Sequence, residues 1–517
     1  MRRRDHIARL AALLVAASMA GSVSWGCAKN RSPRGRGDSG VASFEPLALA
    51  AVQARVLAAA AVPSLDGTIE RAVAIARNAV GFPIDARGAR EAVLLNTPLP
   101  PDVLDLTRPA GAAVVSLGTG KPAAKVIALA VKSRDAATRA IAALGMPIER
   151  RGDAVMVRIE GKPTWLWLKD EVILVSNTAD GLAAGAAAAL EARRANAKDA
   201  SVRLFPPAIA THQGTDVASA ARKVVDEMHA LRQRQLARAG ADTAAVPMPR
   251  AALADSVSQA LTELILARVA EATAVEIDIA LDPVVGATVT ARLHARPETD
   301  LARAAQATQA YAVAPALLAA SGRDAGGIAA VGSMDFAAPA LGALASAVRG
   351  RPASGGVWFE EGGVAAYEAV LGLADASVGP RARRELLAAA GRDTEVASAV
   401  SRDRLHLLIA VGPDARRRLR ELVSSTGGKP TGVLATALSE TAGHGQFGYL
   451  DLASAIRAWL PDGTGFASAL IGAAIPVYGS LHGDGKGGVI TGSLRIPIAA
   501  FAGAGKAARV LMTADGR

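Results

Sequence analysis

The chain has 517 residues, of which 51% are hydrophobic and 20% are charged, and its net charge is +11. This composition excludes an intrinsically disordered chain, because the apolar content is sufficient to bury a large core. The length suits about two to four domains. The positive charge raises the question of nucleic-acid binding, so the segments that carry it have to be identified.

The first segment, residues 1–26, is typical of an export signal. Arg2, Arg3 and Arg4 form a basic start, and an apolar run of 14 residues follows at 10–23. A helix that spans a bilayer needs about 20 apolar residues, whereas the apolar core of a signal peptide needs about 7–15. The run therefore predicts a signal peptide.

Cys27 is the only cysteine of the chain and directly follows Gly26 at the end of this segment. The arrangement resembles the signal peptide of bacterial lipoproteins, in which cleavage behind a small residue leaves the cysteine as the lipidated N-terminus. The resemblance implies that Cys27 carries the lipid. Ordinary cleavage after Ala20 and an uncleaved anchor are the alternatives.

Residues 27–44 are predicted to form a flexible basic tether, because 28–40 are rich in Gly, Ser, Pro and Arg. Residues 1–26 and 28–40 carry a net charge of +3 each, which leaves +5 for the chain from Val41 onward. More than half of the net positive charge therefore lies in the predicted export signal and tether. Since the chain also lacks a recognised nucleic-acid motif, we expect no nucleic-acid partner.

The first predicted body elements are a helix that Ser133 caps and that ends before Gly145, followed by strands at 154–159, 164–168 and 172–176. Trp165 and Trp167 lie two residues apart and share one face of the second strand. Two parallel indole rings are candidates for a ligand-binding groove. Core anchoring is the alternative interpretation.

A predicted helical insert at about 211–272 precedes the clearest hairpin of the sequence. Apolar and polar residues alternate along 275–282 and 287–294, with a turn between the two runs. This period of two predicts an antiparallel pair with one buried and one solvated face. We expect the insert to be a helical cap over a sheet face.

The two halves of the body show matching patterns in the same order. The strand at 172–176 and its helix match 405–411 and the helix that starts near Asp414, and further matches occur at 202–206 with 447–451 and at 289–294 with 490–495. Ala110-Gly111 and Ala325-Gly326 each open an apolar strand. These matches predict a duplication of about 105–297 and 320–497.

The predicted fold class is therefore α+β, with antiparallel sheets, packed helices and two similar tandem halves. The predicted domains are 45–300, which contains the insert, and 301–517.

Several local patterns bear on catalysis. Gly118-Thr119-Gly120-Lys121 lacks the remaining residues of a phosphate loop and predicts a turn between strands. His444, His482, Asp484 and Asp451 are the best candidates for an acid–base site. However, His482 and Asp484 lie in a segment with the composition of a hairpin turn, and Asp451 suits a helix N-cap. No metal-ligand spacing is present, so we expect neither a metal nor a cofactor.

Arg416, Arg417, Arg418 and Arg420 form a basic cluster on a predicted helix. We expect a solvated face or a contact with anionic lipid headgroups.

As a whole, the chain resembles uncharacterised lipoproteins of high-GC Gram-negative bacteria that are rich in alanine and arginine. Ala28 after the cysteine implies, through this resemblance, an outer-membrane lipoprotein that faces the periplasm; secretion is the alternative. The expected role is non-enzymatic binding or scaffolding, with the membrane as partner through the lipid anchor and an envelope protein or apolar ligand as a further partner. An envelope hydrolase and a carrier of apolar ligands or lipids are the alternative functions.

Overall fold

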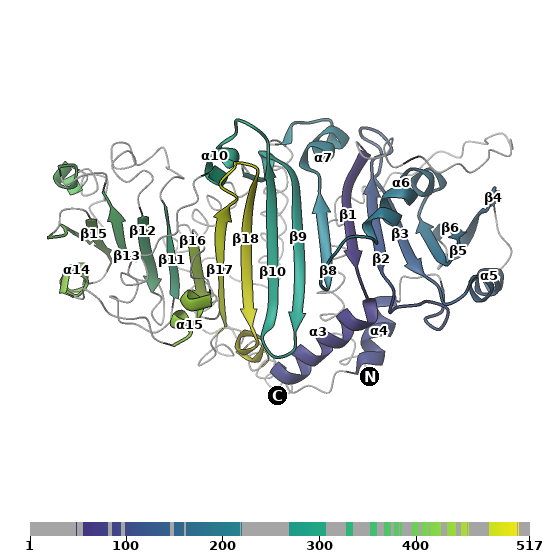
Figure 1. Cartoon of the computed structure of the whole chain (residues 1–517), viewed down its shortest axis with the longest axis horizontal. Helices are drawn as coiled ribbons and strands as arrows, with labels where there is room; N and C mark the ends of the chain where they lie inside the picture. Colours follow the sequence, from purple (N-terminus) through teal and green to yellow (C-terminus); the bar gives the residue numbers. More distant parts are fainter. Residues whose placement is uncertain are drawn as a thin grey trace, which may run out of the picture. The chain divides into compact units, whose positions relative to one another are not determined.

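The computed structural model (Figure 1) divides into two compact units, with the boundary between His294 and Ala295. Unit 1 holds the described residues before this boundary and unit 2 holds those after it. The structure describes residues 48, 55–80, 85–94, 99–144, 149–159, 162–217, 219, 268–306, 327–333, 352–358, 367–373, 377–381, 383–384, 395–402, 406–412, 414–424, 432–440, 446–451, 453, 475–503 and 505. Cys27, the tether, His444 and most of the predicted insert lie outside these residues.

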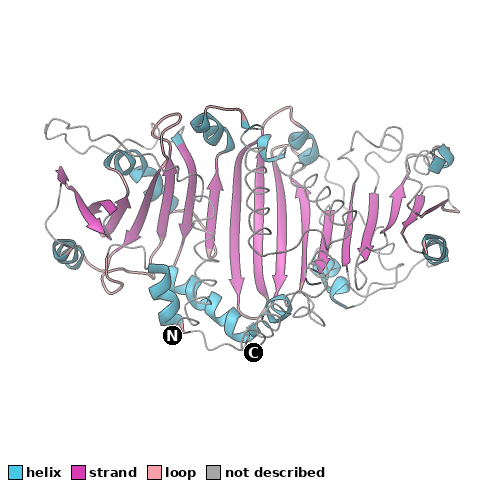
Figure 2. Ribbon diagram, turned by 180° about the vertical axis from the view of Figure 1, so that it is seen from behind, coloured by secondary structure: helices cyan, strands magenta, loops and turns pink. Residues whose placement is uncertain are grey.

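Unit 1 is built on one antiparallel sheet, whose strands run in the order β4-β5-β6-β7-β3-β2-β1-β8-β9-β10. Figure 2 shows the strands side by side from behind. The strands are β1 (Val56–Val62), β2 (Ala110–Val115), β3 (Ala124–Ala130), β4 (Glu149–Arg151), β5 (Ala154–Ile159), β6 (Lys162–Lys169), β7 (Val172–Ser176), β8 (Ala200–Leu204), β9 (Ala272–Asp282) and β10 (Gly286–Ala295). The strands predicted at 154–159, 164–168 and 172–176 and the hairpin at 275–294 are confirmed.

The helices of unit 1 cover both faces of this sheet. They are α3 (Leu65–Val80), α4 (Ala86–Leu94), α5 (Arg134–Ala143), α6 (Ala179–Ala192) and α7 (Pro206–Gln213). One core cluster joins Leu182 of α6 to β2 and β3, and a second cluster joins Leu65 of α3 and Ala137 of α5 to the opposite face. The Ser133 cap is confirmed, because its Oγ accepts a hydrogen bond from Ala136 N at 3.1 Å.

The position of α6 depends on glycines at its contact with the sheet. A Cβ atom on Gly185 of α6 would lie 2.5 Å from Val126 Cγ2 of β3. On the sheet side, a Cβ atom on Gly111 of β2 would lie 2.3 Å from the carbonyl oxygen of Ala189 in α6. Helix and sheet therefore approach more closely than any other residue at these positions would allow.

The β9–β10 hairpin corrects one prediction. We expected its polar face to be solvated, but the side chains of Glu276 and Asp278 are only 27% and 31% exposed. The physical reason is that these carboxylates pair with arginines on the neighbouring strands: Glu276 with Arg203 of β8 and Asp278 with Arg292 of β10.

The strands of unit 2 are also antiparallel and follow the order β14-β15-β13-β12-β11-β16-β17-β18. Its strands are β11 (Gly327–Ser333), β12 (Pro352–Trp358), β13 (Tyr367–Gly372), β14 (Val396–Val400), β15 (His406–Val411), β16 (Gln446–Asp451), β17 (Pro476–Gly483) and β18 (Val489–Pro497). Its helices are α10 (Asp300–Gln306), α14 (Ala415–Ser424) and α15 (Gly432–Glu440). The mixed α+β class with antiparallel sheets is thus confirmed.

The basic helix α14 departs in part from its predicted solvated face. Arg416, Arg417 and Arg420 are exposed, and Arg417 pairs with Asp414 and Glu421. Arg418 is only 3% exposed, because the helix turns this residue inward together with Leu422. Among the described residues, no helix has both the length and the hydropathy that crossing a membrane requires.

Candidate functional site

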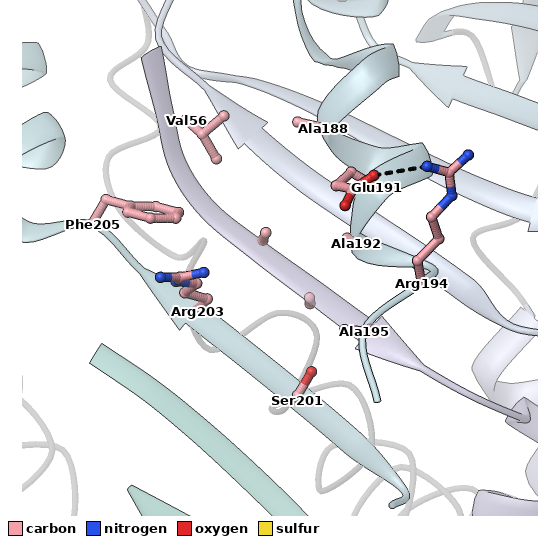
Figure 3. A pocket seen from close by; sticks show the side chains of 12 residues that line it. Val56, Ala188, Glu191, Ala192, Arg194, Ala195, Ser201, Arg203 and Phe205 are labelled. Atoms are coloured by element: carbon pink, nitrogen blue, oxygen red, sulfur yellow. Dashed lines mark hydrogen bonds and ion pairs between the residues drawn. The ribbon is translucent and has the colours of Figure 1, made fainter. Parts of the chain in front are cut away.

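A cavity of about 540 Å³ opens in unit 1 between the end of α6 and strand β8, over the middle of β1. Its size lies within the range of about 300–1,000 Å³ that is typical of small-molecule sites. It is lined by Val56, Ala59, Ala60, Ala61, Ala188, Glu191, Ala192, Arg194, Ala195, Ser201, Arg203 and Phe205 (Figure 3).

Small side chains explain why this space is empty. Ala59 and Ala61 face the cavity side of β1, since they pair with Arg203 and Ser201 of β8. The α6 side contributes Ala188 and Ala192, which are equally short. Because alanines stand on both sides, the side chains of helix and sheet leave a space between them, and an apolar floor remains.

Charged side chains border this apolar floor. Arg203 Nε lies 3.3 Å from Glu276 Oε1, and its guanidinium lies 5.3 Å from the centre of the Phe205 ring. On the α6 side, Arg194 Nη1 donates to Glu191 Oε2 at 3.1 Å. Figure 3 shows Arg203 and Phe205 on one side of β1 and the Glu191–Arg194 pair on the other. The cavity is therefore apolar at its base, with Arg203 on one side and the Glu191–Arg194 ion pair on the other.

A ladder of charges continues from the cavity across β9 and β10. Glu276 contacts Arg203 and also lies with its Oε2 atom 3.4 Å from His294 Nε2. One pair further along, Asp278 is ion-paired with Arg292. Glu276 and Asp278 of β9 thus each pair with a basic side chain on a neighbouring strand, and this arrangement holds Arg203 at the edge of the cavity.

The predicted groove at Trp165 and Trp167 is wrong. The two residues are 4% and 9% exposed and belong to the core cluster beneath α6. Arg151 lies over the Trp165 ring at 5.3 Å and Lys169 over the Trp167 ring at 5.5 Å. Their shared strand face was predicted correctly, but α6 covers that face, so the alternative of core anchoring holds.

Asp484 shapes a turn, as its surroundings in the sequence suggested. Its carboxylate accepts hydrogen bonds from the backbone N–H groups of Lys486, Gly487, Gly488 and Val489, which close the β17–β18 hairpin. Partial burial alone would raise the pKa of this carboxyl group, but the four donors outweigh burial and hold the pKa below its ordinary value. His482 sits on the adjoining strand, paired with Thr491.

Asp451 lies at the other end of β17. Its backbone pairs with Pro476, and its Oδ1 accepts from Ile475 N at 2.8 Å and from Ala453 N at 3.3 Å. At a rise of about 3.3 Å per residue, Pro476 and His482 are about 20 Å apart along the strand. Asp451 is therefore far beyond hydrogen-bond reach of His482, so these two candidates do not form one acid–base site.

One contact was not anticipated from the sequence. Ser116 Oγ and His212 Nδ1 share a hydrogen bond of 2.8 Å, and Ser116 Oγ also accepts from Gly118 N at 3.2 Å. Thr119 Oγ1 donates to the carbonyl oxygen of Thr211 at 3.3 Å. These bonds fix the loop between β2 and β3 to the end of α7, and they confirm that Gly118-Thr119-Gly120-Lys121 is a connection between strands.

The cavity itself was also missed by sequence reasoning. Its signal was the β1 segment, in which four alanines stand between valine and leucine on one side and valine on the other. A strand with so little side-chain volume in its middle leaves space above it unless a partner fills it.

Among the described residues, no group of three His, Cys, Asp or Glu side chains is arranged to hold a metal ion. Comparisons of the chain with protein-family models, with curated proteins and with solved structures find no match.

Proposed function

We propose that this chain is a lipid-anchored cell-envelope protein that acts by binding, and that the cavity of unit 1 is its ligand site. The observation that carries the proposal is the cavity of about 540 Å³ with an apolar floor, Arg203 on one side and the Glu191–Arg194 pair on the other. Among the expected functions, this favours the carrier of an apolar ligand or lipid.

The anchor is supported by the basic start, the short apolar run and the placement of Cys27 behind Gly26. The proposed location is the outer membrane, with the body in the periplasm, and secretion is the alternative. The membrane is then a partner through the lipid on Cys27.

Metabolic labelling with palmitate tests the anchor. The wild-type chain is expected to incorporate label and Cys27→Ala is expected to lose it, because no other cysteine is present to receive the lipid. Equal labelling of the two chains would remove the anchor and leave the cavity proposal intact.

The two units are proposed to be tandem copies of one fold. The order β7-β3-β2-β1-β8-β9-β10 of unit 1 corresponds to β15-β13-β12-β11-β16-β17-β18 of unit 2. In each series the strand before a helix, β7 or β15, is followed by α6 or α14. This correspondence pairs β11 with β1 rather than with β2, so the first copy is proposed to start near Val56, upstream of residue 105.

Filling the cavity tests the proposed function. Ala192 lies half-buried in the last turn of α6, so Ala192→Phe places a ring in the cavity without changing the core. We expect this variant to bind the neutral apolar probe N-phenyl-1-naphthylamine at least tenfold more weakly, measured by fluorescence titration.

Ala187→Phe is the matched control, since Ala187 is half-buried in the same helix and does not line the cavity. It is expected to bind the probe like the wild type. The proposed function is contradicted if the wild type does not bind the probe, or if both variants bind it as the wild type does.

A further inference from the structure

We infer that the cavity of unit 1 takes an amphiphile with one apolar chain and one acidic head group, and that each protein chain binds a single such molecule. This inference rests on the proposed function and specifies its ligand. The alanine floor would hold the apolar chain, and Arg203 and Arg194 would hold the acidic group.

The geometry of Arg203 suits an acidic head. Its contact with Glu276 is made through Nε at 3.3 Å, and the Phe205 ring lies 5.3 Å from the guanidinium carbon. A planar guanidinium that is held on one edge and across one face offers its remaining N–H groups in a fixed direction. The Arg203 side chain is 51% exposed, so a ligand can reach these groups.

Arg194 supplies a second cation on the opposite side. Its side chain is 80% exposed and its partner Glu191 is 51% exposed. Ion pairs at such exposed positions are weak, so an acidic ligand can compete with Glu191 for the guanidinium. A purely apolar molecule would gain nothing from either arginine, and an uncharged polar group would gain only a neutral hydrogen bond, so the two arginines favour an acidic head group.

Unit 2 has a helix, α15, at the strands that correspond to β8 and β9. In the strand correspondence proposed above, β8 and β9 match β16 and β17, and on the latter strands Tyr449 pairs with Tyr478. Both tyrosines are 4% exposed. Helix α15, which stands between α14 and β16, packs against β16 and β17, whereas α6 leads to β8 without another helix.

A hydrogen-bonded cluster holds α15 in place. Tyr478 Oη donates to Glu440 Oε2 at 2.6 Å, and Arg495 Nη1 donates to the same oxygen at 2.7 Å. Burial, together with the bond to Glu440, raises the pKa of Tyr478 to about 12. This cluster and α15 cover that face of β16 and β17, whereas the face over β1 is open. Among the described residues the open cavity therefore belongs to unit 1, and we expect one site per chain.

The experiment uses the fluorescent fatty acid cis-parinaric acid and its uncharged methyl ester with the full-length mature chain. We expect the acid to bind one molecule per chain and at least tenfold more tightly than the ester. Arg203→Gln is expected to weaken binding of the acid at least tenfold and to leave binding of the ester unchanged.

Arg151→Gln is the matched control. Arg151 also lies 5.3 Å from an aromatic ring, that of Trp165, and pairs with a carboxylate, Glu149, but it does not line the cavity. It is expected to bind both probes like the wild type. Displacement by palmitate and by lysophosphatidate distinguishes a carboxylate head from a phosphate head, and zwitterionic lysophosphatidylcholine is expected to displace the probe at least tenfold more weakly.

The outcomes separate this inference from the proposed function. Equal affinities for acid and ester, or equal effects of Arg203→Gln and Arg151→Gln, would overturn the acidic head group while binding of N-phenyl-1-naphthylamine upholds the cavity. Two molecules per chain would overturn the single site. Loss of binding of every probe would overturn the proposed function itself.

Discussion

Asp199→Ala is expected to lower the free energy of unfolding of unit 1 by about 2–3 kcal/mol. The Asp199 side chain is 5% exposed and forms an ion pair with Arg71 of α3. Its Oδ2 atom also accepts a hydrogen bond from Leu281 N of β9 at 2.7 Å. Alanine would leave a partly buried N–H group without its acceptor and a guanidinium without its carboxylate. Because the Arg71 side chain is 36% exposed, water recovers part of this loss.

Asp199 directly precedes β8 and bonds to both α3 and β9, so its replacement is expected to destabilise all three elements. The backbone oxygen of Asp199 accepts from Thr68 Oγ1 at 3.0 Å, which adds a second bond between α3 and the start of β8. Amide hydrogen exchange should therefore accelerate along α3 and β9 in the variant. A melting temperature lower by about 4–12 °C is expected for a unit of this size.

Two further variants make this prediction specific. Asp199→Asn keeps an acceptor for Leu281 N and loses only the charge, so its loss of stability should be about half that of alanine. Glu91→Gln removes the partner of Arg87, in a pair whose side chains are 83% and 59% exposed, and should cost less than about 1 kcal/mol. Equal stability of Asp199→Ala and wild type would contradict the assigned role.

Local signals in the sequence predicted the hairpins of unit 1 well. The strands β5 and β7 have the predicted bounds, because polar turn residues interrupt short runs of β-forming residues at these points. The β9–β10 hairpin was visible in its period of two. In each case the pattern and the contact that it determines lie within a few residues of each other.

Local sequence signals did not predict that β1 is a strand. Its sequence, VLAAAAV, is rich in alanine, which favours helices more than any other residue. It is a strand because β2 and β8 pair with it on both sides, and these partners lie far along the chain. Since β1 is the floor of the cavity, the candidate site depends on the least predictable strand of unit 1.

The burial of the two tryptophans and the position of Arg203 also depend on contacts between distant parts of the chain. The alternation along β6 placed Trp165 and Trp167 on one face, but only the position of α6 determines that this face is buried. Likewise, Arg203 and Glu276 are brought together by the register of β8 and β9, across a long segment of intervening chain. The sequence identified the charged and aromatic side chains, but the pairing of distant strands and the packing of α6 determined which of them lie together.

Gly111→Ala is expected to be the second most damaging substitution, with a loss of about 1–3 kcal/mol in the free energy of unfolding of unit 1. The new Cβ atom would lie 2.3 Å from the carbonyl oxygen of Ala189 and 2.9 Å from the backbone nitrogen of Arg193. Both atoms belong to the backbone at the end of α6, so no rotation of a side chain relieves the contact. The helix must move away from β2.

Gly448→Ala is the control for this prediction. Gly448 also lies in a strand, β16, but nothing stands within 4 Å of a Cβ atom at that position. Its substitution should change stability by less than about 0.5 kcal/mol, as measured by urea unfolding. A comparable loss in both variants would show that strand glycines as such, and not the contact with α6, set the cost.

The Gly111 variant also connects packing to the proposed binding. Ala188, Ala192 and Ala195 form the α6 side of the cavity, yet Gly111 does not line it. A displaced α6 widens the gap over β1 and moves Arg194 away from Arg203, so fewer contacts with a ligand remain on both sides. We therefore expect Gly111→Ala to weaken binding of cis-parinaric acid under conditions in which unit 1 stays folded, and Gly448→Ala to leave it unchanged. Unaltered affinity in Gly111→Ala would mean that the position of α6 does not shape the site.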